Sequence, residues 1–176
     1  MTTTASGTEM HDDLIRIKKT LIKELENYFG PDQKRINHAK EVLKYAEELI
    51  KKEQADPYVV MPAAILHDVG IKAAEEKYKS SAAKYQEELG PAIAGRILVD
   101  IGYEDENIYE ICAIIAHHHT PGPNESANFK SLYDADWLVN LRDEVDTKDK
   151  AKLAMAIDKI FLTDSGRSMA KEIFLK

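Results

Sequence analysis

The residues best able to do chemistry in this chain are histidines and aspartates in apolar surroundings. His38 sits on or beside an apolar helical stripe, and His67 and Asp68 follow the apolar run 63–66. Asp136 lies in the middle of another apolar helical face. A buried imidazole without a partner costs roughly 1 to 3 kcal/mol, and a buried carboxylate needs a cation. A divalent metal ion would satisfy both groups, so these residues predict a metal site.

The elements that must position these residues are helices. Apolar residues recur at helical spacing through most of the chain, with Lys and Glu between them, and no convincing alternating strand or repeat occurs. The sequence therefore predicts an all-α, single-domain helical bundle. The expected helices span 14–29, 32–50, 57–66 with a stop at Gly70, 80–89, 91–100, 106–117, 129–141, 147–162 with Thr147 as cap, and 165–174; a charged surface connection is expected at 72–79.

Length and composition support one globular domain. The chain has 176 residues, a formal net charge of −7 and a single cysteine. The charge disfavours a nucleic-acid polymer as partner, and one cysteine excludes both an intramolecular disulfide and a four-cysteine zinc site. No apolar stretch reaches bilayer length and the amino terminus lacks a secretory signal, so we expect a cytoplasmic protein without a membrane partner. Residues 1–10 are expected to form a flexible tail and 11–176 the domain.

The order and spacing of the four candidate ligands resemble the HD superfamily of metal-dependent phosphohydrolases. That family places a first His, then a His-Asp pair and then a distal Asp on the helices of one bundle. Here the pattern reads His38, then His67 and Asp68, then Asp136, at intervals of 29 and 68 residues, and the match covers about residues 30–141. The resemblance implies an HD-type fold and one divalent ion held by these four residues.

Further ligands are indicated by the run His117–His119, which is similar to the His-Thr-x-Gly segment of small bacterial dinucleoside-polyphosphate hydrolases. Three consecutive histidines cannot all face one site on a helix, so at least one is expected to face solvent. His118 follows inward-facing isoleucines and His119 matches the resemblance, so both stay candidates. Glu87 or Glu88 would have to replace a further His of those hydrolases, and both also fit a solvated helix face. A second ion therefore stays open.

The resemblance implies an enzyme that cleaves a phosphate ester or anhydride of a small phosphorylated metabolite by metal-activated water, with nucleotides the favoured class. A bound ion lowers the pKa of water from about 15.7 towards 7 and polarises the phosphate. Asp68 would orient the attacking water, Arg35 would bind the phosphate, and His118 or His119 would protonate the leaving oxygen. Imidazole and carboxylate ligands favour iron, manganese, cobalt or nickel over magnesium.

Two other functions are compatible with the same residues. A site completed by His118 or His119 and a Glu could hold two irons, as in the oxygenases of the superfamily. A non-catalytic domain could keep the metal for its structure and bind a nucleotide or a protein partner. The lack of a Gly-Tyr-Pro segment disfavours the cyclic-di-GMP phosphodiesterase branch.

Three further expectations concern residues around the site. Asp134 is expected to support or cap rather than to ligate the ion. Arg35 could also be a surface charge that pairs with a nearby Glu. An exposed stripe of Met169, Ile173 and Phe174 could support a homodimer.

Overall fold

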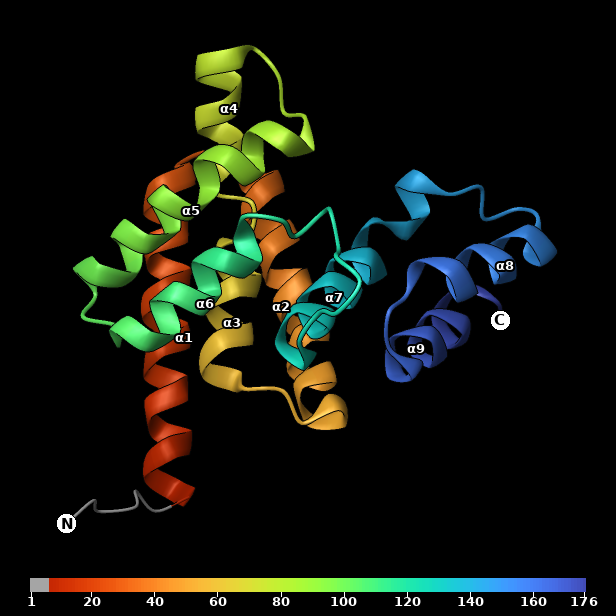
Figure 1. Ribbon diagram of the computed structural model, residues 1–176, viewed down its shortest axis with the longest axis horizontal. Coiled ribbons are helices and arrows are strands. Elements are labelled where there is room, and N and C mark those ends of the chain that lie inside the picture. The colour runs from red at the N-terminus through yellow and green to blue at the C-terminus, as the bar shows by residue number, and fades with distance from the viewer. Residues whose placement is uncertain (1–6) are drawn as a thin grey trace.

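The computed structural model describes residues 7–176, and over these residues it has nine α-helices and no strand (Figure 1). The all-α fold predicted from the sequence is therefore confirmed. In this described part of the chain, none of the helices is both long and apolar enough to cross a membrane. The helices are α1 (Gly7–Phe29), α2 (Gln33–Glu53), α3 (Pro57–Leu66), α4 (Gly70–Tyr78), α5 (Ala83–Asp100), α6 (Asp105–Ile115), α7 (Ala127–Glu144), α8 (Lys150–Ile160) and α9 (Asp164–Phe174).

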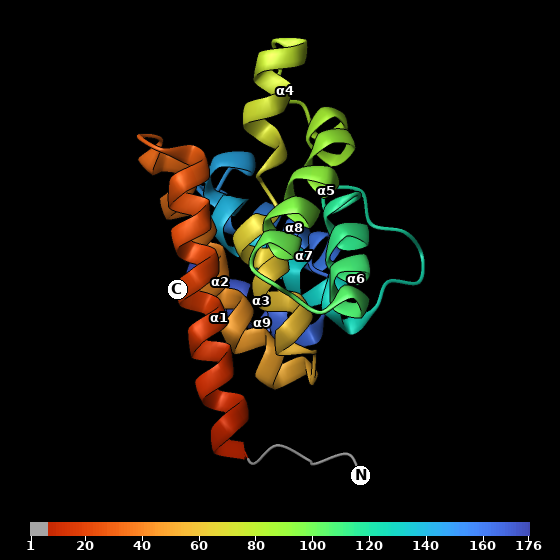
Figure 2. The ribbon, with the colours of Figure 1, turned by 90° about the vertical axis from the view of Figure 1, so that its left-hand side faces the viewer.

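The short helix α3 forms the centre of the bundle. Its residues 59–66 are all buried, and it packs against α1, α2, α6 and α7 (Figures 1 and 2). A helix that is apolar on every side must be surrounded by other helices, which explains its central position. α2 contributes a one-sided apolar stripe from Ile36 to Ile50 and also packs along α7. The bundle therefore brings the carboxyl end of α3 next to α2 and α7.

A turn at residues 67–69 joins α3 to α4 and carries both His67 and Asp68. The Tyr28 hydroxyl of α1 donates a hydrogen bond to the Val69 carbonyl oxygen at 2.9 Å. Because the turn is attached to α1 on one side and follows the buried helix α3 on the other, its two polar side chains have defined directions. The chain thus places its His-Asp pair at a helix end, where neighbouring side chains can point to one centre.

Glycines allow α4, α5 and α6 to approach one another closely beyond this turn. A Cβ atom on Gly70 would lie 2.4 Å from the carbonyl oxygen of Gln86, closer than any side chain fits. A Cβ atom on Gly90 would lie 3.0 Å from the side chain of Ile115. The start of α4 is therefore packed directly on the backbone of α5, and Figures 1 and 2 show the rest of α4 projecting from one end of the bundle.

Two helix predictions in this region are wrong. The expected surface connection at 72–79 is most of helix α4, whose Ala74 side chain is fully buried. The two helices expected on either side of Gly90 and Pro91 form one helix, α5, which continues through both residues. The packing of Gly70 against α5 keeps these helices intact, because tertiary contacts override the local preference of charged runs and helix breakers.

Two boundaries also differ from the sequence expectation. Helix α1 begins at Gly7, ahead of the expected domain start near His11, and residues 1–6 of the expected tail lie outside the described residues. Helix α8 is capped by Asp149, whose side chain accepts a backbone N–H, rather than by Thr147. Both differences concern helix ends, where several neighbouring polar residues can serve as the cap.

One buried carboxylate, that of Asp134 in α7, holds the segment between α8 and α9. It accepts the backbone N–H of Leu162 at 2.8 Å, the backbone N–H of Thr163 at 2.9 Å and the Thr163 hydroxyl at 2.7 Å. The Thr163 oxygen in turn accepts the N–H of Gly166 at the start of α9. Asp134 therefore has the supporting role expected of it, whereas the cap of α9 is Thr163, which Asp134 holds in place.

The stripe expected to support a homodimer is not exposed. Met169 and Phe174 are only 8% and 7% exposed, and Ile173 is partly buried against the same core. These side chains pack within the chain because α9 lies against α7 and α2. The sequence argument for a homodimer through this stripe is therefore wrong.

We expect Asp134→Ala to lower the free energy of unfolding by about 2 to 4 kcal/mol, because it leaves two buried hydrogen-bond donors and one partly buried donor without an acceptor. Urea unfolding followed by circular dichroism measures this change. Asp164→Ala removes an exposed carboxylate beside the same cap and is the matched control, with an expected change under about 0.5 kcal/mol. Equal effects of the two variants would contradict the role of Asp134.

Candidate metal centre

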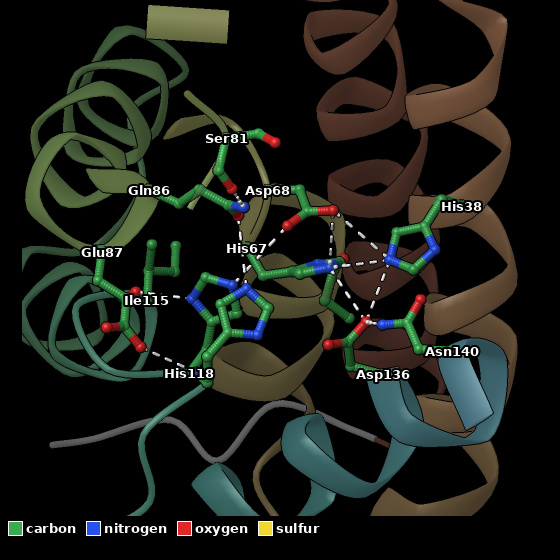
Figure 3. Close-up of polar contacts among 12 residues, drawn as sticks. His38, His67, Asp68, Ser81, Gln86, Glu87, Ile115, His118, Asp136 and Asn140 are labelled. Carbon is green, nitrogen blue, oxygen red and sulfur yellow. Dashed lines mark hydrogen bonds and ion pairs between the residues drawn. The ribbon is translucent and has the colours of Figure 1, made fainter. Parts of the chain in front are cut away.

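Four side chains from three parts of the bundle converge at the end of α3 (Figure 3). His38 comes from α2, His67 and Asp68 from the turn after α3, and Asp136 from α7. The Nε2 atom of His38 lies 3.3 Å from Nε2 of His67 and 3.1 Å from Oδ1 of Asp136. Oδ2 of Asp68 lies 3.5 Å from both Nε2 atoms. The four residues selected by the sequence pattern therefore meet at one point.

These separations fit a shared metal ion. Metal–nitrogen and metal–oxygen bonds of about 2.1 Å place neighbouring ligand atoms about 3.0 to 3.4 Å apart in octahedral or tetrahedral geometry. The donor atoms of His38, His67 and Asp68 form a cluster that could hold an ion. Two imidazoles supply nitrogen ligands and two carboxylates balance a charge of +2. This donor set suits a divalent transition metal.

The rings of His67 and His118 are each oriented by the helix that precedes them. In the neutral rings, Nδ1 of His67 donates to the Ala64 carbonyl oxygen and Nδ1 of His118 to the Ile115 carbonyl oxygen, both at 2.8 Å. With the proton on Nδ1, the lone pair that a metal requires is on Nε2. Both rings therefore present Nε2 toward Asp68.

Asp68 also belongs to a second cluster, with His118 and His119. Its Oδ1 lies 3.7 Å from Nε2 of His118, whereas its Oδ2 faces His38 and His67. Nε2 of His118 is buried and has no hydrogen-bond partner among the described residues. Such an unpaired buried nitrogen costs roughly 1 to 3 kcal/mol, and a cation between it and the carboxylate would satisfy it. The residues present thus fit one ion, with room in the donor set for a second.

The charges at the centre shift several pKa values. Burial disfavours the imidazolium form of His67, but Asp68 and Asp136 outweigh burial and raise the pKa of His67 from 6.5 to about 9. Burial likewise opposes ionisation of the two carboxyl groups, yet the facing imidazoles lower the pKa of both. Burial lowers the pKa of His119, so this ring is neutral at pH 7. The centre therefore holds two ionised carboxylates that require positive charge.

His117 is the member of the histidine run that points away from the centre. Its Nε2 lies 3.2 Å from Oε1 of Glu125, and its ring stacks on Phe129 with centroids 4.6 Å apart. Its side chain is 37% exposed, whereas that of His118 is 1% exposed. The expectation that at least one of the three histidines faces away is confirmed.

Neither of the two candidate glutamates belongs to a ligand cluster among the described residues. One carboxylate oxygen of Glu87 accepts both the backbone N–H of His119 and the hydroxyl of Thr120, each at 3.0 Å. Glu88 lies on the surface and pairs with Lys77 at 3.3 Å. Glu87 therefore holds the histidine loop in place, and Glu88 is a solvated charge.

Two amides that the sequence analysis did not select contact the candidate ligands. Asn140 donates from Nδ2 to Oδ1 of Asp136 at 2.8 Å, and Oε1 of Gln86 lies 3.4 Å from Nε2 of His119. Gln86 is also fixed by its donation to the Ser81 carbonyl oxygen at 2.6 Å. Asn140 follows Asp136 by one helical turn, a spacing that could have identified it. Gln86 has no such signal, because it reaches His119 from a different helix.

The centre lies beside an open cleft of about 690 Å³ that is lined in part by His38 and Asp68. Arg35 also lines the cleft. Its two terminal nitrogens contact carboxylates, Nη1 that of Asp32 and Nη2 that of Glu75 in α4. Arg35 therefore links α2 to α4 through an ion pair with a Glu, while it still faces the space where a substrate would lie.

Comparison with known families matches residues 35–161 to the HD domain. The chain belongs to the HD-domain family. This match and the order of the four central residues support a place for the chain in a superfamily of metal-dependent hydrolases. No curated protein matches the chain.

A solved structure is similar to this HD domain in fold. It is the crystal structure of a predicted HD superfamily hydrolase from an uncultured Thermotogales bacterium, with a TM-score of 0.65 and 24% sequence identity. The similarity covers 88% of this chain and 83% of that chain. At this level of identity the comparison confirms the helical fold and carries no conclusion about substrate.

We expect an ion that binds the four-residue site at pH 7 to release about one proton, because His67, with a pKa of about 9, is protonated until an ion takes its place. The affinity should fall about tenfold per unit as the pH drops from 9 to 6.5, and it should be independent of this group above pH 9. Calorimetric titration in buffers of different ionisation enthalpy counts the protons. His117→Gln is the control and should release the same number, whereas a pH-independent affinity would contradict the assignment.

Proposed function

We propose that this HD domain hydrolyses a phosphate ester or anhydride of a small phosphorylated metabolite. The observation that carries the proposal is the convergence of His38, His67, Asp68 and Asp136 beside a cleft of about 690 Å³. A divalent ion bound there supplies Lewis acidity toward a phosphate oxygen and lowers the pKa of water to near 7. Nucleotides, the class favoured by the sequence resemblance, and other phosphomonoesters are the substrates to compare.

The ion that we propose is a transition metal. Imidazole and carboxylate ligands suit iron, manganese, cobalt or nickel better than magnesium, which prefers oxygen ligands. One ion fits the four-residue site. The orphaned Nε2 of His118 supports a second ion, which Asp68, His118 and His119 would hold.

Asp68, Arg35 and Lys34 are charged groups that a substrate would meet in the cleft. The lowered pKa of Asp68 keeps it ionised at neutral pH, so it can accept a hydrogen bond from the attacking water and orient it. Arg35 and Lys34 offset the negative charge of the phosphate. The charge of Arg35 is shared with Asp32 and Glu75, whereas Lys34 has no carboxylate partner in the described part of the chain.

The geometry favours His118 as a metal ligand over the proton-donor role expected for it from the sequence. Its side chain is 1% exposed and its Nε2 faces Asp68, so a substrate in the cleft does not reach it. His119 lines the cleft and is placed to hydrogen-bond a leaving-group oxygen when the four-residue site alone is loaded. Its lowered pKa makes it a neutral ring at pH 7, which donates an N–H bond without carrying charge.

A di-iron oxygenase is the second candidate function, because Asp68 is common to two ligand clusters. Aerobically purified protein with iron bound, a mixed-valent iron signal and oxygen uptake would favour it. A non-catalytic HD domain would instead bind nucleotides and release phosphate from none of them. The intact ligand set and the open cleft beside it favour the hydrolase over both alternatives.

Phosphate release from a panel of phosphomonoesters and anhydrides tests the hydrolase directly, with protein loaded with iron, manganese, cobalt, nickel or magnesium. We expect Asp68→Asn and His67→Ala to lower kcat/KM at least about 100-fold, because each removes a metal ligand. His117→Gln changes a histidine that points away from the centre and should keep kcat/KM within about twofold. Full turnover in both ligand variants, or no release with any metal, would overturn the proposal.

The number of ions per chain tests the second cluster separately. We expect about two ions per chain in the wild-type protein and about one in His118→Ala, since this variant removes the ligand whose Nε2 has no other partner. Elemental analysis of protein reconstituted with a single metal and passed through gel filtration measures the ratio. The same ratio in wild-type and variant protein would show that His118 binds no ion.

A further inference from the structure

We infer that the alcohol part of the substrate is hydroxyl-rich, a sugar or another polyol, rather than a nucleoside. The inference rests on the proposed phosphohydrolase function and deepens it. The observation behind it is the composition of the cleft lining. No Phe, Tyr or Trp lines the cleft in the described part of the chain, and Ile71 and Val139 are its only aliphatic residues. All other lining residues carry charged or hydrogen-bonding side chains.

This lining offers a nucleobase little to stack on. Proteins bind bases largely by stacking them on aromatic rings, worth about 1 to 3 kcal/mol per base, and ordinary ligand pockets are mostly apolar. Among the described residues, the only rings that line the cleft are those of His38 and His119. His38 is turned toward the metal ligands, and the ring of His119 lies against that of His118 with centroids 4.0 Å apart.

The polar groups of the cleft match a polyol instead. Each hydroxyl group donates one hydrogen bond and accepts others, so carboxylates and amides bind it well. Asn37, Glu41, Asp143 and Glu144 line the cleft, and among the described residues their side chains have no hydrogen-bond or ion-pair partner. The Oδ1 atom of Asn140, whose Nδ2 donates to the metal centre, likewise has no donor. These groups are available to the hydroxyls of a substrate.

Helix α2 orders these groups along one face. Lys34, Asn37, His38 and Glu41 follow one another at helical spacing and all line the cleft. A phosphate near His38 is within one helical turn of the ammonium group of Lys34 on one side and of the carboxylate of Glu41 on the other. The ammonium group of Lys34 is therefore placed to attract the phosphate. Asn37 and Glu41 are placed to hydrogen-bond the hydroxyl groups next to that phosphate.

The test compares kcat/KM of the metal-loaded chain for ribose 5-phosphate and glucose 6-phosphate with that for adenosine and thymidine 5′-monophosphates. p-Nitrophenyl phosphate serves as a common reference. We expect a preference of at least about tenfold for the sugar phosphates. We also expect Asn37→Ala and Glu41→Ala each to lower the sugar phosphate to p-nitrophenyl phosphate ratio about tenfold, as loss of one hydrogen bond predicts.

Lys40→Gln is the matched control, because Lys40 lies on the same helix but pairs with Glu26 outside the cleft. It should leave the ratio unchanged. A preference for the nucleotides, or an unchanged ratio in both cleft variants, overturns the inference and leaves the hydrolase standing.

If no substrate releases phosphate, the proposed function fails and binding alone decides the inference. Nitrogen-15 NMR of the side-chain amides of Asn37 and Asn140 in the full chain then reports on titration with ribose 5-phosphate and with adenosine 5′-monophosphate, which carry the same phosphate. Shifts at lower concentrations of ribose 5-phosphate support the inference. Shifts at lower concentrations of adenosine 5′-monophosphate, or no shifts with either probe, overturn it.

Discussion

Two largely buried carboxylates, Asp136 facing two imidazoles and Asp68 facing three, are the constraint on which the rest of this structure depends. Removing a carboxylate from water costs several kcal/mol unless a positive charge and hydrogen bonds replace the water. Asp68 and Asp136 meet this requirement because Nε2 of His38 and of His67 lies 3.1 to 3.5 Å from them. A proton on His67 or a bound divalent ion would offset the negative charge of these two carboxylates. The carboxylates that require positive charge in the folded chain are thus also the groups that would bind a cation.

The frame around the centre keeps these atoms in place. α3 is buried on every side, so the turn that follows it cannot move without disturbing the core. Gly70 and Gly90 let the backbones of α4 and α5 approach, which fixes the far side of the turn. Asn140 holds Asp136 from its own helix, and Glu87 holds the histidine loop through a backbone N–H. Directional contacts of this kind make a metal site precise, because ligand positions then depend on the fold and not on flexible side chains.

Beyond the centre, the polarity of the cleft bears on the substrate more than its size does. A volume of about 690 Å³ accommodates many metabolites, whereas a lining with two aliphatic residues in the described part of the chain accommodates few apolar ones. Arg35 is partly neutralised by its two carboxylate partners, whereas Lys34 has no carboxylate partner among residues 7–176 and keeps its positive charge unshared. The family match supports a metal-dependent hydrolase, and these side chains support our inference about the alcohol part of its substrate.

The sequence by itself determined the all-α class and selected the four residues that meet at the centre. Helical periodicity marks the buried face of each segment, and a His or Asp on such a face requires a partner wherever the helix packs. Only the tertiary structure decided the roles that depend on partners from other helices. His118 faces Asp68, Arg35 pairs with Glu75, and the continuity of α5 through Gly90 rests on its contact with α4 and α6. The physical reason is that local spacing specifies which side of a helix is buried, whereas the packing of distant helices specifies what each buried atom meets.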